Sequence, residues 1–198
     1  MIDSFLILGT VSIKDSSSLG LNMTNVAMVG AGQTKFGNHP LGLKGMWAEA
    51  SEKAYSSIDG DFDLSMVDEA YIGSIAFGGS QLGNTAALLT EHSGLKGVPV
   101  RRVENACASS GFALRDAWMA IKSGQADVVI AGGIEKMNDV SGYAATETLA
   151  TAADQEWEAF FGATFPSIYA MIATRHMYEY GTSKEQLAQV AIKNHSNG

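Results

Sequence analysis

Apolar and polar residues follow one another along residues 24–137 in a pattern that predicts alternating strands and helices. Short apolar runs bounded by glycine predict buried strands, and longer stretches with apolar residues on one face predict helices. The run Val128-Val129-Ile130-Ala131 is apolar throughout, as in a strand covered on both faces. In chain order we expect a strand at 26–29, a helix at 47–58, a strand at 69–77, a helix at 85–91, a strand at 98–103, a helix at 107–123 and a strand at 128–131.

Strands and helices that alternate through short connections predict an α/β fold, in which a mostly parallel sheet is flanked by helices. We assign residues 23–137 to this core. The pattern changes after Asn138, because residues 138–174 contain five carboxylates, four prominent aromatic residues and no Lys or Arg. Helices are expected at 166–180 and 183–194. Residues 138–198 are therefore predicted to form a mostly helical cap, with no further strand after it.

The first 22 residues differ from the rest of the chain. Residues 14–21 (KDSSSLGL) are small and polar and show neither a helical nor a strand period. A serine run of this kind has little to bury. We expect residues 1–22 to lie outside the folded domain, as a disordered or non-native extension, with Met23 as the natural beginning.

Composition narrows the class of protein. The chain has 198 residues, of which 46% are hydrophobic and 17% are charged, so it can build a sizeable core and is not disordered as a whole. A formal net charge of −8 argues against a nucleic-acid partner. One cysteine cannot form an internal disulfide, which favours a reducing, cytoplasmic setting. No leader peptide and no apolar stretch long enough to cross a membrane is found, so no membrane association is expected.

The single cysteine is the main candidate for chemistry. Cys107 lies in the sequence ENACASSG, where a strand is expected to end and a helix with small residues in its first turn to begin. A helix N-terminus stabilises a thiolate, and small neighbours let a substrate approach. The competing interpretation is a buried structural cysteine, which is the more usual fate of a lone thiol.

Other candidates are weaker. A reactive thiol needs a proton acceptor, but His39, His92, His176 and His195 all lie in ordinary surface or helix-end settings. The third glycine after Gly30 and Gly32 comes too late for a dinucleotide-binding fingerprint. No phosphate-binding loop and no metal-ligand spacing occurs, so no metal and no resident cofactor are expected. The pair Gly132-Gly133 is interpreted as the end of a strand.

Several of these motifs resemble one enzyme family. ENACASSG followed by ADVVIAGGIEKM, the opening VAMVGAGQTKFG and the tail TRHMYEYGTSKEQLAQVAIKNH closely resemble the N-terminal half of thiolases, in particular the archaeal and sterol-carrier-type branch. The resemblance covers about residues 24–198. It implies a half of βαβαβαββ topology, which is one part of a five-layered αβαβα fold.

The resemblance also implies roles for residues. Cys107 matches the nucleophile that takes an acyl group from acyl-CoA as a thioester, and Gly132, Gly133 and Met137 match a segment beside the active site. Coenzyme A thioesters are then substrates, and the reaction is acetoacetyl-CoA formation, as used in isoprenoid synthesis and lipid metabolism, or 3-ketoacyl-CoA thiolysis. A homo-oligomer is expected for the full-length enzyme, and a basic partner protein is possible for the acidic cap.

Motifs of the family's second half do not occur in this chain. Among them are the activating histidine, the second cysteine and most oxyanion donors, and the fifth strand of the first half is missing too. We therefore expect an N-terminal fragment that is inactive alone. Two alternatives stay open: a condensing enzyme of the ketoacyl-synthase type, which ENACASSG also resembles, and a non-catalytic half-thiolase that only binds and dimerises.

Overall fold

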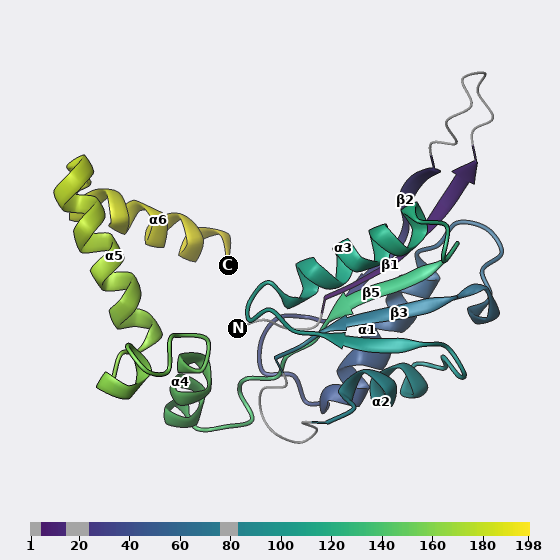
Figure 1. Ribbon diagram of the computed structural model, residues 1–198, viewed down its shortest axis with the longest axis horizontal. Helices are drawn as coiled ribbons and strands as arrows, with labels where there is room; N and C mark the ends of the chain where they lie inside the picture. Colours follow the sequence, from purple (N-terminus) through teal and green to yellow (C-terminus); the bar gives the residue numbers. More distant parts are fainter. Residues whose placement is uncertain (1–4, 15–23, 76–82) are drawn as a thin grey trace. The chain divides into compact units, whose positions relative to one another are not determined.

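The computed structural model describes residues 5–14, 24–75 and 83–198, and the chain divides into two compact units, Met1–Ser141 and Gly142–Gly198. Unit 1, residues 1–141, holds a five-stranded sheet with the strand order β2-β1-β5-β3-β4 (Figure 1). Its strands are β1 (Phe5–Lys14), β2 (Thr24–Gln33), β3 (Glu69–Gly73), β4 (Val100–Val103) and β5 (Val129–Gly133).

The sheet is mixed. β3 pairs in parallel with both β4 and β5, whereas β1 pairs antiparallel with both β2 and β5. Because β2 and β5 run against the same strand, they are parallel to each other. The predicted α/β class, with a mostly parallel sheet flanked by helices, is confirmed.

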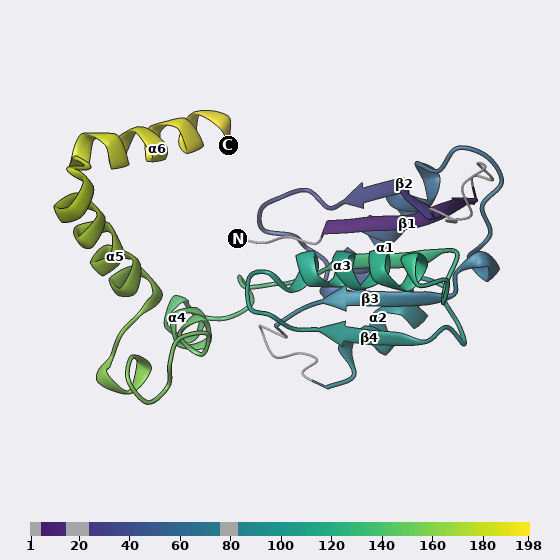
Figure 2. The same cartoon turned by 45° about the horizontal axis from the view of Figure 1, so that its top comes forward.

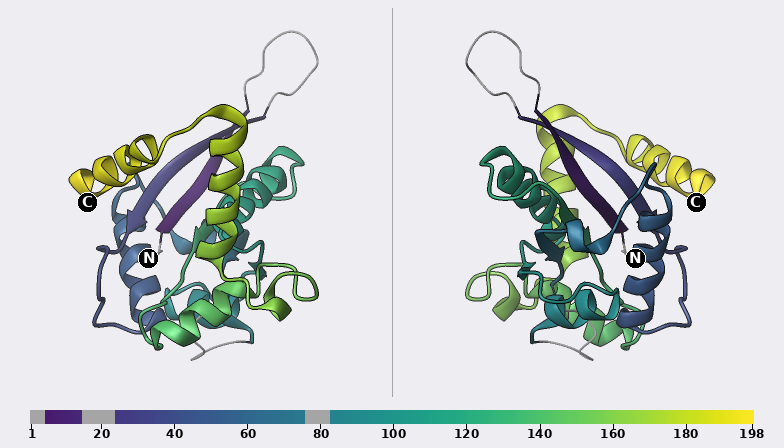
Figure 3. Two further views of the ribbon diagram at one scale, coloured as in Figure 1. Left: turned by 90° about the vertical axis from the view of Figure 1, so that its left-hand side faces the viewer. Right: turned by 90° about the vertical axis from the view of Figure 1, so that its right-hand side faces the viewer.

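Helices cover both faces of this sheet. They are α1 (Leu43–Ser56), α2 (Thr85–His92) and α3 (Ser109–Lys122), with a 3₁₀ turn at Leu64–Met66. Side chains alternate along β3, so Ala70 and Ile72 join the core under α1 and α2, while Tyr71 joins a second core under α3. α1 and α3 accordingly lie on opposite sides of the strands (Figures 2 and 3).

Most predicted elements are present with shifted ends. The helix expected at 47–58 begins four residues earlier, at Leu43, and the one expected from Cys107 begins at Ser109. The strand expected at 26–29 extends over all of Thr24–Gln33. Part of the strand expected to reach Phe77 falls on residues 76–82, outside the described residues.

The expectation for residues 1–22 needs correction at the first ten described positions. Phe5–Lys14 forms β1 and lies inside the sheet, paired on both edges, and not outside the folded domain. The sequence FLILGTVSIK is rich in β-branched and aliphatic residues, which favour a strand. The serine-rich segment that suggested an extension comes after this strand, and residues 15–23 lie outside the described residues.

Unit 2, residues 142–198, is helical. It contains α4 (Gly142–Ala150), a 3₁₀ turn at Ala159–Phe161, α5 (Phe165–Tyr180) and α6 (Lys184–Asn197). α5 ends where Gly181 takes a left-handed conformation, which stops a helix at little cost. None of the three α-helices has a buried residue.

Candidate active site

Cys107 lies on a tight turn between β4 and α3. The strand ends at Val103, Ala108 is the N-cap of α3, and Cys107 therefore precedes the helix by two residues and does not begin it. Its neighbour Ala106 has φ 45°, a left-handed conformation that is uncommon for a residue with a side chain. Strained backbone of this kind persists only where surrounding contacts hold it, and it clusters at functional sites.

Hydrogen bonds brace this turn on both sides of the cysteine. The Ala106 amide donates to Glu104 Oε1 at 2.6 Å, and the Asn105 amide donates to Ser109 Oγ at 2.9 Å. The Ser109 hydroxyl in turn donates to the Ala106 carbonyl oxygen at 2.6 Å, and Ser109 is buried. These contacts fix the backbone on which the thiol is carried.

The thiol itself is accessible. Cys107 is a free, exposed cysteine, so the interpretation as a buried structural cysteine is excluded. In the described part of the chain, the amide N–H groups of Ser110 and Gly111, in the first turn of α3, form no hydrogen bond with protein atoms. Such amides at a helix N-terminus attract negative charge. The exposed Cys107 sulfur thus lies close in sequence to backbone N–H groups that form no hydrogen bond with the described protein atoms.

A pair of glycines lets the start of α3 approach the sheet. Gly73 of β3 and Gly133 of β5 are register partners. A Cβ on Gly73 would lie 2.4 Å from the Ser110 amide nitrogen, and a Cβ on Gly133 would lie 2.8 Å from Ser110 Cβ. Any larger residue would push the helix start, and the turn before it, away from the strands. Gly133 is therefore a packing residue and not merely the end of a strand.

The carboxyl ends of the three parallel strands are tied together beside this turn. The Ser74 amide donates to the Val103 carbonyl oxygen at 3.1 Å, and the Ile134 amide donates to the Gly73 carbonyl oxygen at 3.0 Å. The buried carboxylate of Glu135 accepts from the Ile75 amide at 2.9 Å. Met137, which follows, is half-buried. Ligands of α/β proteins commonly bind at this edge, and the candidate nucleophile lies on it.

Glu135 was missed by the sequence reasoning. A glutamate directly after a continuous apolar strand is the signal that could have singled it out, because a buried carboxylate needs nearby donors.

Gly30 and Gly32 serve packing as well. A Cβ on Gly32 would lie 2.1 Å from the Ala50 carbonyl oxygen, and one on Gly30 would lie 2.7 Å from that of Ala54. These glycines let α1 lie against β2. Both glycines therefore have a packing role.

The histidines are engaged elsewhere. His39 Nε2 lies 3.0 Å from Glu49 Oε2, and its Nδ1 accepts from the Leu41 amide, which places the ring proton on Nε2. The hydrogen bond from Lys53, together with that from His39, lowers the pKa of Glu49 below its ordinary value. His176 and His195, in unit 2, bond to Thr182 and to the Ala191 carbonyl oxygen.

No hydrogen bond joins Cys107 to either histidine of unit 1 within the described residues. His92, at the end of α2, is exposed. Within the described residues of unit 1, neither His39 nor His92 therefore serves as a hydrogen-bond partner of Cys107.

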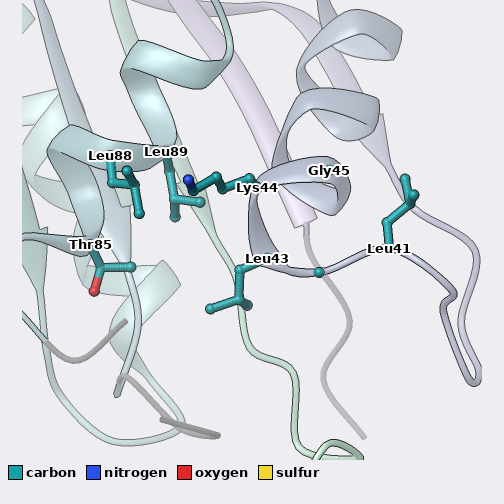
Figure 4. A pocket seen from close by; sticks show the side chains of 8 residues that line it. Leu41, Leu43, Lys44, Gly45, Thr85, Leu88 and Leu89 are labelled. Carbon is teal, nitrogen blue, oxygen red and sulfur yellow. The ribbon is translucent and has the colours of Figure 1, made fainter. Parts of the chain in front are cut away.

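An apolar hollow of about 440 Å³ lies between the N-terminal ends of α1 and α2 (Figure 4). Half of its lining residues are leucines, and it has one cation, Lys44, and one hydroxyl, Thr85. The lining contains no cysteine, histidine or carboxylate. The hollow can accept an apolar group.

Neither a metal centre nor a membrane helix emerges from the described residues. No cluster of three or more His, Cys, Asp or Glu side chains that could hold a metal ion occurs among them. None of their helices combines the length and the hydropathy needed to cross a bilayer.

Comparison with known proteins identifies relatives. Acetyl-CoA acetyltransferase of Methanothermobacter thermautotrophicus is 47% identical over 177 residues, which cover 88% of this chain and 45% of that protein. The protein of the same name from Methanocaldococcus jannaschii is 46% identical over 179 residues. These cover 88% of this chain and 44% of that protein. Sterol carrier protein 2 of Gallus gallus is 30% identical over 182 residues, covering 87% and 32%.

This chain thus spans less than half the length of these relatives. The model of the thiolase N-terminal domain matches residues 26–198, which include the strands β3, β4 and β5, the Cys107 turn and all of unit 2. The chain belongs to the thiolase family and carries its N-terminal domain.

Proposed function

We propose that this chain carries the acyl-accepting part of a thiolase-type acyltransferase, with Cys107 as the nucleophile. The observation that carries the proposal is the exposed thiol on a strained, hydrogen-bonded turn directly before α3. Relatives named acetyl-CoA acetyltransferase support acetyl-CoA as an acyl donor. The match to the thiolase N-terminal domain favours this reaction over that of a ketoacyl synthase.

The first half-reaction forms an enzyme thioester. The Cys107 thiolate attacks the carbonyl carbon of acyl-CoA, the bond from that carbon to the CoA sulfur breaks, and CoA leaves as a thiolate that takes up a proton. Negative charge develops on the carbonyl oxygen during the attack. Among the described residues, the amides of Cys107 itself, Ser110 and Gly111 form no hydrogen bond with protein atoms and could donate to this oxygen.

The second half-reaction returns the enzyme to its free state. In the condensing direction, the carbanion of a second acetyl-CoA attacks the thioester carbon, Cys107 leaves, and acetoacetyl-CoA forms. In the degradative direction, CoA attacks the thioester of an enzyme acylated from a 3-ketoacyl-CoA. Both directions use the same cysteine and need no resident cofactor.

In the described part of unit 1, no histidine forms a hydrogen bond with the Cys107 thiol, so a proton acceptor for it is not identified there. His39 is held by Glu49, and His176 and His195 bond locally within unit 2. We assign the proton acceptor and the second oxyanion donor to residues outside this chain. Loss of one oxyanion donor alone costs about 10² to 10³ in rate, so this chain is expected to accept an acyl group slowly and not to turn over.

Peptide mass spectrometry tests the nucleophile. The chain is incubated with acetyl-CoA, and acetylation of each cysteine-containing peptide is measured over time, with and without the remaining part of a relative such as the Methanothermobacter enzyme. We expect label on Cys107, faster when the second part is present, and none in Cys107→Ser.

The matched control moves the thiol to the other end of the same helix. Ser123 is the exposed C-cap of α3, so the double variant Cys107→Ser, Ser123→Cys offers a thiol of similar access without the turn. Equal labelling at position 123 would show generic thiol reactivity and would refute the assignment. Full condensing activity from this chain alone would refute the need for outside groups.

A further inference from the structure

β1 occupies an interior position in the sheet, although it is the first strand of the chain. It lies between β2 and β5, with nine residue pairs to β2 and four to β5 (Figures 1 and 2). α1 and α3, on opposite faces of the sheet, both contact it. The strand is therefore bordered on two edges and covered on two faces.

The match to the family domain does not include this strand. The thiolase N-terminal domain matches from residue 26, inside β2, to residue 198. Strands in a sheet are about 4.8 Å apart. Residues 24–141 without β1 would therefore leave β2 and β5 about 9.6 Å apart, with one strand position unfilled between them.

Leaving that position unfilled is costly because its border on β5 is buried. Ile130 and Ala131 of β5, which face Leu8 and Ile7 in the register, are 0% and 3% exposed. Backbone N–H and C=O groups in such surroundings need hydrogen-bond partners, and each one without a partner costs about 1–3 kcal/mol.

We propose that the gap between β2 and β5 is a strand-binding site, filled in cis by Phe5–Lys14 as a donor strand. The ligand of this site is an extended peptide that runs antiparallel to both borders. Its main chain supplies the affinity, as in other cases of strand addition. Residues 5–14 thus complete a sheet whose remaining strands lie within or overlap the matched family domain. They fill a position for which residues 26–198 provide no strand among the described residues.

Deletion and peptide rescue form the first test. Removal of residues 1–22 is expected to abolish the cooperative unfolding transition of unit 1 or to lower its midpoint by more than 10 °C, whereas removal of residues 1–4 leaves it unchanged. A synthetic peptide of residues 5–14, added during refolding, is expected to restore the transition. A peptide with Ile7→Pro, which removes one amide and breaks the strand, should not. An unchanged midpoint after removal of residues 1–22 would overturn the proposal.

Disulfide trapping in the complete chain forms the second test and does not depend on the shortened chain folding. In a Cys107→Ser background, Ile7→Cys and Ala131→Cys place two thiols at directly opposed positions of β1 and β5. Opposed residues share a face, whereas the neighbouring residue faces the other way. Oxidation should link the 7–131 pair and not the control pair Leu6→Cys with Ala131→Cys. Linkage in neither pair, or equal linkage in both, would contradict the register. Neither test uses acyl transfer as a readout, so both are independent of the proposed function.

Discussion

The helices of unit 1 and those of unit 2 are held by different interactions. α1, α2 and α3 have no side-chain cap at their N-termini, but each buries residues against the sheet. α5 and α6 have complete capping boxes, at Thr164 with Ser167 and at Ser183 with Gln186, and bury nothing. Tertiary packing can replace capping, because it contributes more than local hydrogen bonds do to most helices in proteins.

The same contrast appears in the aromatic residues. Trp157, Phe160 and Phe161 of unit 2 are each more than 70% exposed, while Trp47 of unit 1 is fully buried. The acidic segment also has local roles, since Asp154 Oδ1 accepts from the amides of Glu156 and Trp157, and Glu158 Oε2 accepts from that of Asp154. Unit 1 therefore derives its stability from a core, and unit 2 derives its shape from turns and caps.

The largest expected effect is a loss of unfolding free energy when a tryptophan of unit 1, but not one of unit 2, is replaced by alanine. Trp47→Ala removes a fully buried ring whose Nε1 donates to Ser93 Oγ at 3.1 Å, so the free energy of unfolding should fall by about 3–5 kcal/mol. Trp157→Ala removes a ring that is 76% exposed and should change the free energy of unfolding by less than about 0.5 kcal/mol. Urea denaturation followed by circular dichroism measures both. Similar losses in the two variants would contradict the contrast between the units.

A second comparison uses glycines. Gly73→Ala places a methyl group 2.4 Å from the Ser110 amide nitrogen, and we expect a loss of about 1–3 kcal/mol together with slower acylation of Cys107. At Gly142, at the start of α4, an added methyl group would meet no atom within 4 Å. Gly142→Ala should therefore leave the stability and the rate of Cys107 acylation unchanged. Thermal unfolding and acetylation kinetics are the measurements. If Gly73→Ala is as stable and as reactive as the parent chain, the close approach of α3 does not matter.

The alternation of apolar runs was enough to predict most of unit 1, since β3, β4 and β5 each combine short length with glycine or polar boundaries. The same alternation placed Cys107 between a strand and a helix, and its role as nucleophile stays a prediction. Local hydrogen bonds decided what the pattern could not show: Ser109 Oγ and the left-handed Ala106 delay the helix beyond the cysteine. The glycine pair 73 and 133 could not be distinguished from strand ends, because the reason for it lies in a helix start far away in sequence.

The position of β1 could not be predicted for a similar reason. Its hydrogen-bond partners on one edge, Ile130 to Gly133, are more than 110 residues away in the sequence. A strand that pairs over such a distance leaves no local signal beyond β propensity. The neighbouring serine-rich segment at residues 14–21 has little β propensity. It was the basis of the prediction that residues 1–22 lie outside the folded domain.

A smaller effect, confined to alkaline pH, distinguishes two tyrosines. Burial, and then the hydrogen bond and charge of Glu69, raise the pKa of Tyr71 to about 12 from an ordinary value of 10. The unfolded chain therefore loses this proton first as pH rises, so the stability that Tyr71 contributes is complete below pH 10 and is lost between about pH 10 and 12. Tyr71→Phe should flatten the fall of unfolding free energy over this range.

Tyr143→Phe is the control, because it removes the phenol oxygen from a residue of unit 2 that is 80% exposed. The slope of its unfolding free energy against pH should equal that of the parent chain. Denaturation at closely spaced pH values measures the slopes. A slope for Tyr71→Phe equal to that of the parent chain would show that this buried phenol is not protected.

The smallest effect tests the caps directly. Ser183→Ala removes the hydroxyl that accepts from the Gln186 amide and breaks the capping box of α6 at a cost of about 1 kcal/mol. Because α6 buries nothing, this cost should appear locally, as faster hydrogen exchange of amides in the first two turns of α6, and not in the unfolding transition of unit 1. Ser196→Ala, near the other end of the same exposed helix, has no capping role and should leave exchange in those turns unchanged. If Ser183→Ala instead shifted the unit 1 transition by the same 1 kcal/mol, α6 would be energetically coupled to the sheet, and the division between a unit held by packing and a unit held by caps would be wrong.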